Sequence, residues 1–297
     1  MDKTFDSSVP TIELTGGIQI PQTGFGTFKI WPYIAQEAVE QALELGYRHI
    51  DTAAAYANEK QVGDALAATG MADSVFVTSK LRNGQQGRET TLRAFDQSLK
   101  DLGLDAIDLY LIHWPVPMFD KYVETWETLI ELQEQGLIRA IGVSNFLIEH
   151  LERLIAETGV VPAVNQIESH PHFWQPELDA YCQEHGIVIE SYSPLGRGGD
   201  IESEPVCAAA DRVGATPAQV VLRWHVQMGH VILPKSEHVE RMRENMDIYG
   251  FELTQDEMDA ISALDCPEGR ISGDPREFDQ DQSLEDMLAR GTLKLHP

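Results

Sequence analysis

Short runs of β-branched and other apolar residues alternate along the chain with longer segments of helical period. Segments 35–45 and 90–102 each place apolar residues three or four positions apart, with polar residues between them. This spacing gives one apolar face and predicts amphipathic helices. Pro217 suits the first turn of a later helix, which runs to about Met228. The predicted strands are 23–26 (the weakest pattern), 48–51, 75–80, 107–113, 138–144, 164–167, 188–191 and 231–234.

Glycines follow the predicted helices where a left-handed helix end is expected. Gly46, Gly103 and Gly136 follow the first, third and fourth of them. Strand–helix alternation repeated about eight times indicates a parallel sheet. In 297 residues, this number of units favours a closed barrel over an open doubly wound sheet. We therefore predict the α/β class, with one (β/α)8 TIM-barrel domain over residues 1–297.

Two segments lie outside the predicted barrel. Residues 1–22 are expected to form an N-terminal β-hairpin cap, with strands at 11–14 and 18–20 around a Gly-Gly turn. The tail 266–297 is rich in glycine, proline and acidic residues, which predicts an irregular C-terminal arm with a helix at 283–290.

Composition narrows the classes of partner. The net charge is −26, from 48 acidic and 22 basic residues, so the surface repels nucleic acid and anionic membranes. No apolar run approaches a membrane span, and the first ten residues lack signal-peptide features, so we expect a soluble cytoplasmic protein. No interface pattern stands out, which favours a monomer. The three cysteines are far apart and are expected to be reduced: Cys182, Cys207 and Cys266.

Several familiar site motifs are missing. The chain has no G-x-G-x-x-G after an early strand, no Walker loop, no H-E-x-x-H and no G-x-S-x-G. The ten histidines show no clear metal-ligand spacing. His170 and His172 flank Pro171, and without further ligands we interpret them as part of a surface loop and not as half of a metal site.

Ionisable residues stand at the ends of three consecutive predicted strands. Asp51 ends the second strand and is followed by Tyr56, Lys80 ends the third strand, and His113 ends the fourth. In a (β/α)8 barrel these ends share the face that carries the active site. Taken singly, the residues have structural explanations: a helix-capping turn, a solvated charge and a packed strand end. Their joint placement favours catalysis.

The four residue types suit proton transfer to a carbonyl. A phenol has a pKa near 10, and the cation of Lys80 is expected to lower the pKa of Tyr56. Asp51 can pair with Lys80, and His113 can hydrogen-bond and orient a carbonyl oxygen. Together they can protonate that oxygen while hydride reaches the carbon.

Six further segments appear in a familiar order. They are 46–53 with Tyr56, Asn58 and Glu59; Asp-Leu-Tyr-Leu-Ile-His-Trp-Pro at 108–115; Gly-Val-Ser-Asn-Phe at 142–146; Asn-Gln-Ile-Glu at 165–168; Ser-Pro-Leu-Gly at 193–196; and Leu-Pro-Lys-Ser at 233–236. With these motifs the sequence resembles the aldo-keto reductase family from about Ile12 to Leu264. The most similar branch is that of the microbial reductases that include 2,5-diketo-gluconate reductases.

The resemblance implies a barrel that binds NADPH across its C-terminal face and uses Asp51, Tyr56, Lys80 and His113 as its catalytic tetrad. It also implies a site for the adenosine 2′-phosphate, and lysine, serine and arginine suit a phosphate dianion. The implied cofactor contacts are Gly26, Thr27, Ser144, Asn145, Gln166, Tyr192, Ser193, Leu195, Lys235, Ser236, Arg241, Glu244 and Asn245.

Two positions depart from the family pattern. Arg82 stands where related enzymes often carry tryptophan, and we hypothesise that it admits anionic or hydroxylated carbonyl substrates. Glu237 follows Ser236, and an acid there weakens the preference for NADPH and leaves NADH possible. The expected substrate contacts are Phe28, Trp31, Arg82 and Trp114.

The leading hypothesis is an NADPH-dependent oxidoreductase that reduces a small-molecule aldehyde or ketone to an alcohol. A second is an NADPH-binding regulatory subunit without significant turnover, which has no evident need for Tyr56 and Lys80. A third is a non-redox barrel such as a lyase or isomerase. Quenching of cofactor fluorescence separates the third from the first two, and turnover separates the first from the second.

Overall fold

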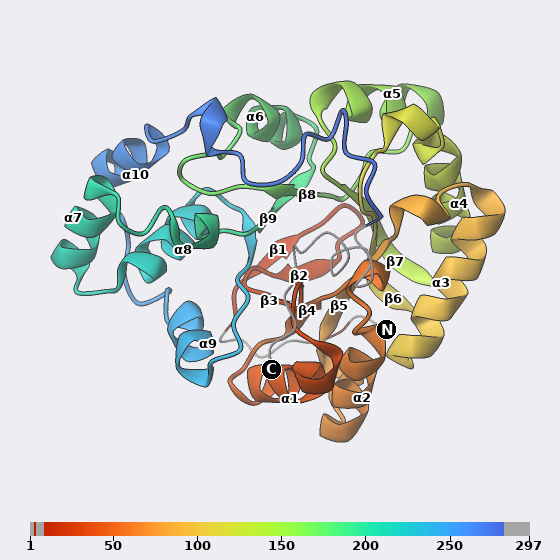
Figure 1. Ribbon diagram of the computed structural model, residues 1–297, viewed down its shortest axis with the longest axis horizontal. Helices are drawn as coiled ribbons and strands as arrows, with labels where there is room; N and C mark the ends of the chain where they lie inside the picture. Colours follow the sequence, from red (N-terminus) through yellow and green to blue (C-terminus); the bar gives the residue numbers. More distant parts are fainter. Residues whose placement is uncertain (1–2, 4–8, 282–297) are drawn as a thin grey trace.

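The computed structural model describes residue 3 and residues 9–281, and its centre is a closed barrel of parallel strands (Figure 1). Consecutive strands pair in chain order, and a bridge between Thr23 and Ile232 joins the first to the last. The (β/α)8 prediction is confirmed. The barrel strands are β3 (Phe25–Gly26), β4 (His49–Asp51), β5 (Phe76–Leu81), β6 (Ile107–Ile112), β7 (Ile138–Ser144), β8 (Val164–Glu168), β9 (Val188–Tyr192) and β10 (Val231–Leu233).

The seam between β3 and β10 requires glycine. The Gly24 amide donates to the carbonyl of Ile232 at 2.9 Å, so the two chains lie close together. A Cβ at Gly24 would lie 2.7 Å from both Nδ1 of His49 and Cδ2 of Leu233. Any larger residue would push β3 away from β10 and open the barrel.

Helices cover the outside of the strands (Figure 1). Each amphipathic segment turns its apolar face inward, and Gly103 and Gly136 end two helices with positive φ, as predicted. Pro217 is the first residue of its helix, and the Thr216 hydroxyl caps it by accepting from the Gln219 amide. The helices are α1 (Pro32–Glu44), α2 (Glu59–Thr69), α3 (Arg88–Leu102), α4 (Tyr122–Glu134), α5 (Ile148–Thr158), α6 (Pro176–Glu184), α7 (Glu204–Val213), α8 (Pro217–Gln227), α9 (Val239–Met246) and α10 (Gln255–Ser262).

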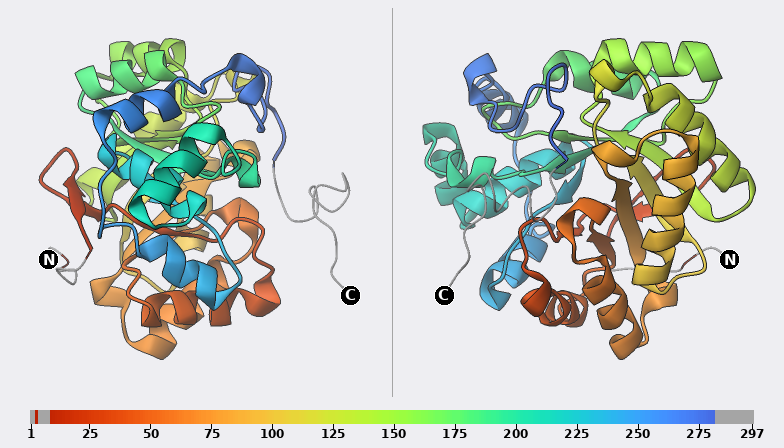
Figure 2. Two further views of the ribbon diagram at one scale, coloured as in Figure 1. Left: turned by 90° about the vertical axis from the view of Figure 1, so that its left-hand side faces the viewer. Right: turned by 45° about the vertical axis from the view of Figure 1, so that its right-hand side comes forward.

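The predicted N-terminal hairpin is present as β1 (Thr11–Glu13) and β2 (Gln19–Pro21). Leu14, directly after β1, and Ile20 of β2 pack against Phe76 at the start of β5, so the hairpin closes the N-terminal end of the barrel. Figure 2 shows the hairpin and the C-terminal arm on opposite sides of the molecule.

The C-terminal arm, residues 263–281, is irregular apart from the short turn Pro267–Gly269, as predicted. It runs from α10 across the barrel (Figure 1), and the Cys266 amide bonds the carbonyl of His172 at 3.1 Å. The helix predicted at 283–290 lies outside the described residues. The three cysteines are free thiols. In the part of the chain that the structure describes, no helix is long and apolar enough to span a bilayer.

Candidate active site

The four ionisable residues predicted from the strand ends come together at the C-terminal end of the barrel. Lys80 is fully buried, and its Nζ donates to both carboxylate oxygens of Asp51 at 2.7 Å and to the carbonyl of Thr52 at 2.9 Å. The same Nζ lies 3.3 Å from the hydroxyl of Tyr56, which stands on the short turn after β4. A phenol, an ammonium and a carboxylate therefore form one buried chain.

His113 lies on the other side of Tyr56, with ring centroids 5.7 Å apart and the planes at 72°. Burial lowers the pKa of His113 well below its usual value, and the charge of Lys80 lowers it further. The imidazole is therefore neutral at physiological pH and can hydrogen-bond a carbonyl oxygen.

The predicted lowering of the pKa of Tyr56 is wrong in direction. Burial raises the pKa of Tyr56 well above 10, and the negative charge of Asp51 raises it further. Lys80 lies 3.3 Å from the phenol, but burial has the larger effect on its pKa. The phenol stays protonated at neutral pH, which is the form that a proton donor needs.

A second group of polar side chains, which the resemblance implies as cofactor contacts, lies next to these hydrogen-bonded residues. Ser144 ends β7 and donates to the Gln166 carbonyl at 2.8 Å, while Gln166 Nε2 donates to Asp51 at 2.9 Å. The Tyr192 hydroxyl donates to Asn145 Oδ1 at 2.7 Å. Asn145 has φ 62°, a left-handed conformation that asparagine tolerates and that turns the chain sharply after β7.

The remaining residues predicted as cofactor contacts lie after β3, after β9, after β10 and on α9. Thr27 follows Gly26 at the end of β3 and donates to the carbonyl of Asp51 at 2.9 Å. Ser193, which has φ 49°, and Leu195 lie in the loop after β9. Further contacts lie after β10 or on α9: Lys235, Ser236, Arg241, Glu244 and Asn245.

Three cations from different loops lie near one another. The pKa of Lys29 is lowered first by burial and then by the charges of Arg197 and Lys235. Lys235 also pairs with Glu237 at 2.5 Å. On a chain of net charge −26, such a cluster suits an anionic ligand. Lys29 and Arg197 were not predicted from the sequence. Each is a lone basic residue in the loop after a barrel strand, Lys29 after β3 and Arg197 after β9.

The aromatic residues predicted for the substrate side line the same end of the barrel. The Phe28 ring lies 5.0 Å from Tyr56, and Trp31 is buried beside Tyr33. Trp114 stacks on Phe278 of the arm, with centroids 4.0 Å apart. The arm therefore adds an aromatic contact to Trp114 that was not predicted from the sequence.

Arg82 contacts the arm, although its side chain remains partly exposed to solvent. Its guanidinium pairs with the carboxylate of Asp281, whose other oxygen accepts from the Gly84 amide at 3.1 Å. Asn83 Nδ2 bonds the carbonyl of Gln280 at 2.6 Å. The arm thus lies over the loop after β5 and places a carboxylate on the unusual arginine.

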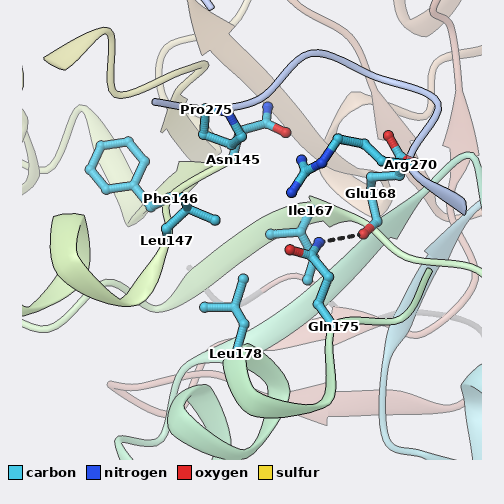
Figure 3. A pocket seen from close by; sticks show the side chains of 9 residues that line it. All are labelled: Asn145, Phe146, Leu147, Ile167, Glu168, Gln175, Leu178, Arg270 and Pro275. Carbon is cyan, nitrogen blue, oxygen red and sulfur yellow. Dashed lines mark hydrogen bonds between the residues drawn. The ribbon is translucent and has the colours of Figure 1, made fainter. Parts of the chain in front are cut away.

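Glu168 holds the arm where it first crosses the barrel. Its carboxylate accepts from the backbone amides of Ile271 and Ser272 at 2.6 and 2.7 Å. Figure 3 shows Arg270 of the arm beside Glu168 at a small cavity, with Gln175 below them. Gln175 Nε2 donates to the Glu168 carbonyl at 2.8 Å, which closes the loop between β8 and α6 below the arm.

The prediction of a surface loop at His170 is wrong. His170 is buried, and its two ring nitrogens lie 3.2 Å from Glu168 and 2.8 Å from Asp200. Burial alone would lower the pKa of His170, but the bonds to Asp200 and Glu168 raise it to about 9. His170 and His172 both contact Asp200. Within the described ranges, no group of side chains has the arrangement of a metal site.

Sequence comparison agrees with this geometry, because the sequence model of the Aldo/keto reductase family matches residues 23–200 and 201–265. The chain belongs to this family. An aldo-keto reductase of Mycolicibacterium smegmatis is 47% identical over 91% of this chain and 98% of its own length. Methylglyoxal reductase DkgA of Escherichia coli K12 is 47% identical over 90% of this chain and 97% of its own length.

A solved structure of similar sequence has the same fold. A mutant of Gox0644 in complex with NADPH has a TM-score of 0.88 and 44% sequence identity, covering 91% of this chain and 98% of that one. The similarity therefore extends through the whole barrel and confirms both the fold and the family resemblance.

Proposed function

We propose that this aldo/keto reductase uses NADPH to reduce aldehydes or ketones to alcohols, with Tyr56 as the proton donor. The contact between Lys80 Nζ and the Tyr56 hydroxyl carries the proposal, because it places a cation beside the atom that gains negative charge. The naming of similar enterobacterial proteins as methylglyoxal reductases makes 2-oxo-aldehydes the first substrates to test.

The residues of this chain fit NADPH. Lys29, Arg197 and Lys235 form a cation cluster suited to phosphate groups, and Arg241 is exposed on the adjoining helix α9. The complex of Gox0644 with NADPH supports the same cofactor. The ion pair between Lys235 and Glu237 competes with a phosphate, so NADH remains a second cofactor to assay.

NADPH, when bound, supplies the hydride that reaches the carbonyl carbon. His113 and Tyr56 orient the carbonyl oxygen by hydrogen bonding, and Tyr56 donates its proton to that oxygen as the C–H bond forms. The phenolate produced lies next to the buried Lys80, whose charge offsets it. Asp51 keeps Lys80 in place, and the phenolate regains a proton from solvent before the next turnover.

The test is to follow NADPH absorbance with the purified protein and a panel of carbonyls that begins with methylglyoxal. We expect turnover with several aldehydes and a preference for NADPH over NADH. Tight NADPH binding without turnover across the panel would replace the proposal with a regulatory binding module. Absence of cofactor binding would reject both.

We propose further that Arg82 belongs to the substrate site and recognises a negatively charged group. Its guanidinium, directly after β5, already holds one carboxylate, that of Asp281. Both side chains are about one-third exposed (30% and 35%), so the pair can exchange partners with a ligand from solvent. A substrate carboxylate would compete with Asp281 for the same guanidinium.

Changing Asp281 to Asn should therefore lower KM for an anionic aldehyde such as succinic semialdehyde by about two- to five-fold, the size expected for a partly exposed ion pair. KM for a neutral aldehyde of similar length should stay the same. Arg82→Trp should raise KM for the anionic aldehyde, and combining it with D281N should abolish the gain. Equal changes for charged and neutral substrates would contradict a charge-recognition role.

A further inference from the structure

Glu190 is a second carboxyl group inside the barrel, next to the catalytic chain. It lies on β9 and its side chain is fully buried. Gln166 Nε2 donates to Glu190 Oε2 and to Asp51 Oδ2, both at 2.9 Å. The two carboxyl groups therefore share one amide, and both oxygens of Asp51 also accept from Lys80.

The buried charges around Glu190 do not balance if it is ionised. The titratable groups that face it are His49 and Asp51 from β4 and Lys80 from β5, while Gln166 from β8 is uncharged. His49 Nε2 lies 3.6 Å from Glu190, and burial lowers the pKa of His49 to about 3, so its ring carries no charge. One ammonium can offset one carboxylate, and a second carboxylate that is fully buried would lack both a cation and contact with the surface.

We propose that Glu190 is a positioning residue of this site, an uncharged acid that holds Gln166 and leaves Asp51 as the carboxylate that pairs with Lys80. The inference rests on the proposed reductase function. Burial, followed by the charge of Asp51, raises the pKa of Glu190 to about 8, which agrees with the charge balance. Lys80 lies next to Asp51, so of the two carboxyl groups it is Glu190 that keeps the proton.

Ionisation of Glu190 should slow carbonyl reduction. A second negative charge beside Asp51 would weaken the hold of Asp51 on Gln166 and oppose the negative charge that forms on Tyr56 during proton transfer. Tyr56 and His113 do not titrate near pH 8, because their pKa values are displaced well above and well below it. We therefore expect an alkaline limb of the rate profile near pH 8 that arises from Glu190.

The first experiment compares kcat between pH 6.5 and 9.5, at saturating NADPH, for wild type and Glu190→Gln. The variant keeps an oxygen that accepts from Gln166 but cannot ionise. Wild-type kcat should fall roughly five- to ten-fold with a midpoint near pH 8, whereas E190Q should lack this fall. His170, whose pKa is about 9, is present in both proteins and cancels. The same midpoint in both proteins would overturn the proposal.

Glu59→Gln is the matched control. Glu59 is also a buried acid, with its pKa raised by burial to about 7, but it hydrogen-bonds Ser79 and not Gln166. E59Q should keep the wild-type midpoint near pH 8. Loss of the alkaline limb in E59Q would show that the limb arises from Glu59, and would overturn the role of Glu190.

A stability measurement tests the same proton without turnover. The folded protein holds a proton on Glu190 up to about pH 8, whereas the unfolded chain loses it near pH 4.3. Glu190 therefore makes wild-type stability fall as pH rises from about 5 to 8, so the Tm of E190Q relative to wild type should rise across that window. A difference in Tm that does not vary with pH would overturn the proposal, even if the protein reduces no carbonyl.

The two readouts separate the possible failures. Absence of turnover with the expected change in Tm would reject the proposed function but leave Glu190 as a protonated acid. The expected change in Tm without a change in the rate profile would overturn the positioning role. If E190Q does not fold, a ¹³C NMR titration of glutamate carboxyls in wild type should show one group titrating near pH 8, above Glu59. Its absence would overturn the proposal.

Discussion

Replacing Tyr56 with phenylalanine should lower kcat for carbonyl reduction by about 10²- to 10⁴-fold, the usual contribution of a positioned general acid. The phenol is 8% exposed and 3.3 Å from Lys80, and water has little access to replace it as the donor. The ring itself packs against Phe28 and His113, and phenylalanine preserves those contacts. NADPH affinity, followed by quenching of protein fluorescence, should change less than three-fold.

Tyr110→Phe is the control for this prediction. Tyr110 is a fully buried tyrosine whose ring packs edge-on against Phe95 of helix α3, away from the reacting groups. Its loss should leave kcat within about two-fold of wild type, because only an outer packing position changes. Similar losses of kcat in both variants would mean that the effect of Tyr56→Phe is structural, and would reject Tyr56 as the acid.

The pKa shift of Tyr56 also predicts the form of the rate profile. Because burial raises the pKa of Tyr56 well above 10, the acid form of the phenol persists through the range in which most enzymes are assayed. Reduction should therefore lose no rate below pH 9 through Tyr56. Oxidation of an alcohol by the reverse reaction needs the phenolate, so its rate should keep rising with pH.

The barrel and its catalytic chain could be predicted because both depend on local patterns. Apolar runs and amphipathic periods set the strands and helices, and the predicted strands differ from those in the structure by no more than two residues at either end. Asp51, Lys80 and His113 all follow the rule that the active site lies at the carboxyl ends of the strands. Any sequence with this alternation places those residues together.

Contacts between distant loops could not be predicted in this way. The partner that buries His170 is Asp200, which lies beyond β9, and no sequence period links them. Lys29 and Arg197 form part of the cation cluster only after the barrel closes. Asp281 reaches Arg82 across nearly two hundred residues of sequence. Such pairs depend on how loops of irregular conformation pack. The chemical type of each residue does not predict that packing.

The direction of the pKa shift at Tyr56 is a case of the same kind. The residue types alone suggested that a lysine cation would lower the pKa of Tyr56. The structure shows that Asp51 accepts two bonds from Lys80, which matches its charge, and that burial is the larger effect on the phenol. The direction of the shift depends on the relative sizes of three effects on the phenol: burial, the charge of Asp51 and the charge of Lys80. Residue identity does not give these sizes.

Replacing Lys80 with methionine should have the largest effect on stability, about 3–5 kcal/mol, because it leaves the carboxylate of Asp51 buried without its cation. The side chain of Lys80 is fully buried and that of Asp51 is 5% exposed, so solvent cannot compensate. Burial already raises the pKa of Asp51. Without Lys80, the carboxyl should take up a proton in the folded state, so K80M should lose most stability at high pH and least near pH 5.

The double variant Asp51→Asn, Lys80→Met separates the two roles of the pair. It removes both charges, so most of the stability lost in K80M should return in urea unfolding at pH 8, with a coupling energy of about 2–3 kcal/mol. Activity should not return, because the double variant still lacks the Lys80 ammonium that lies 3.3 Å from the Tyr56 oxygen in wild type. Equal stability of K80M and the double variant would show that Asp51 does not depend on Lys80. Recovery of kcat in the double variant would show that Lys80 acts only by holding the fold together, and would remove it from the chemistry.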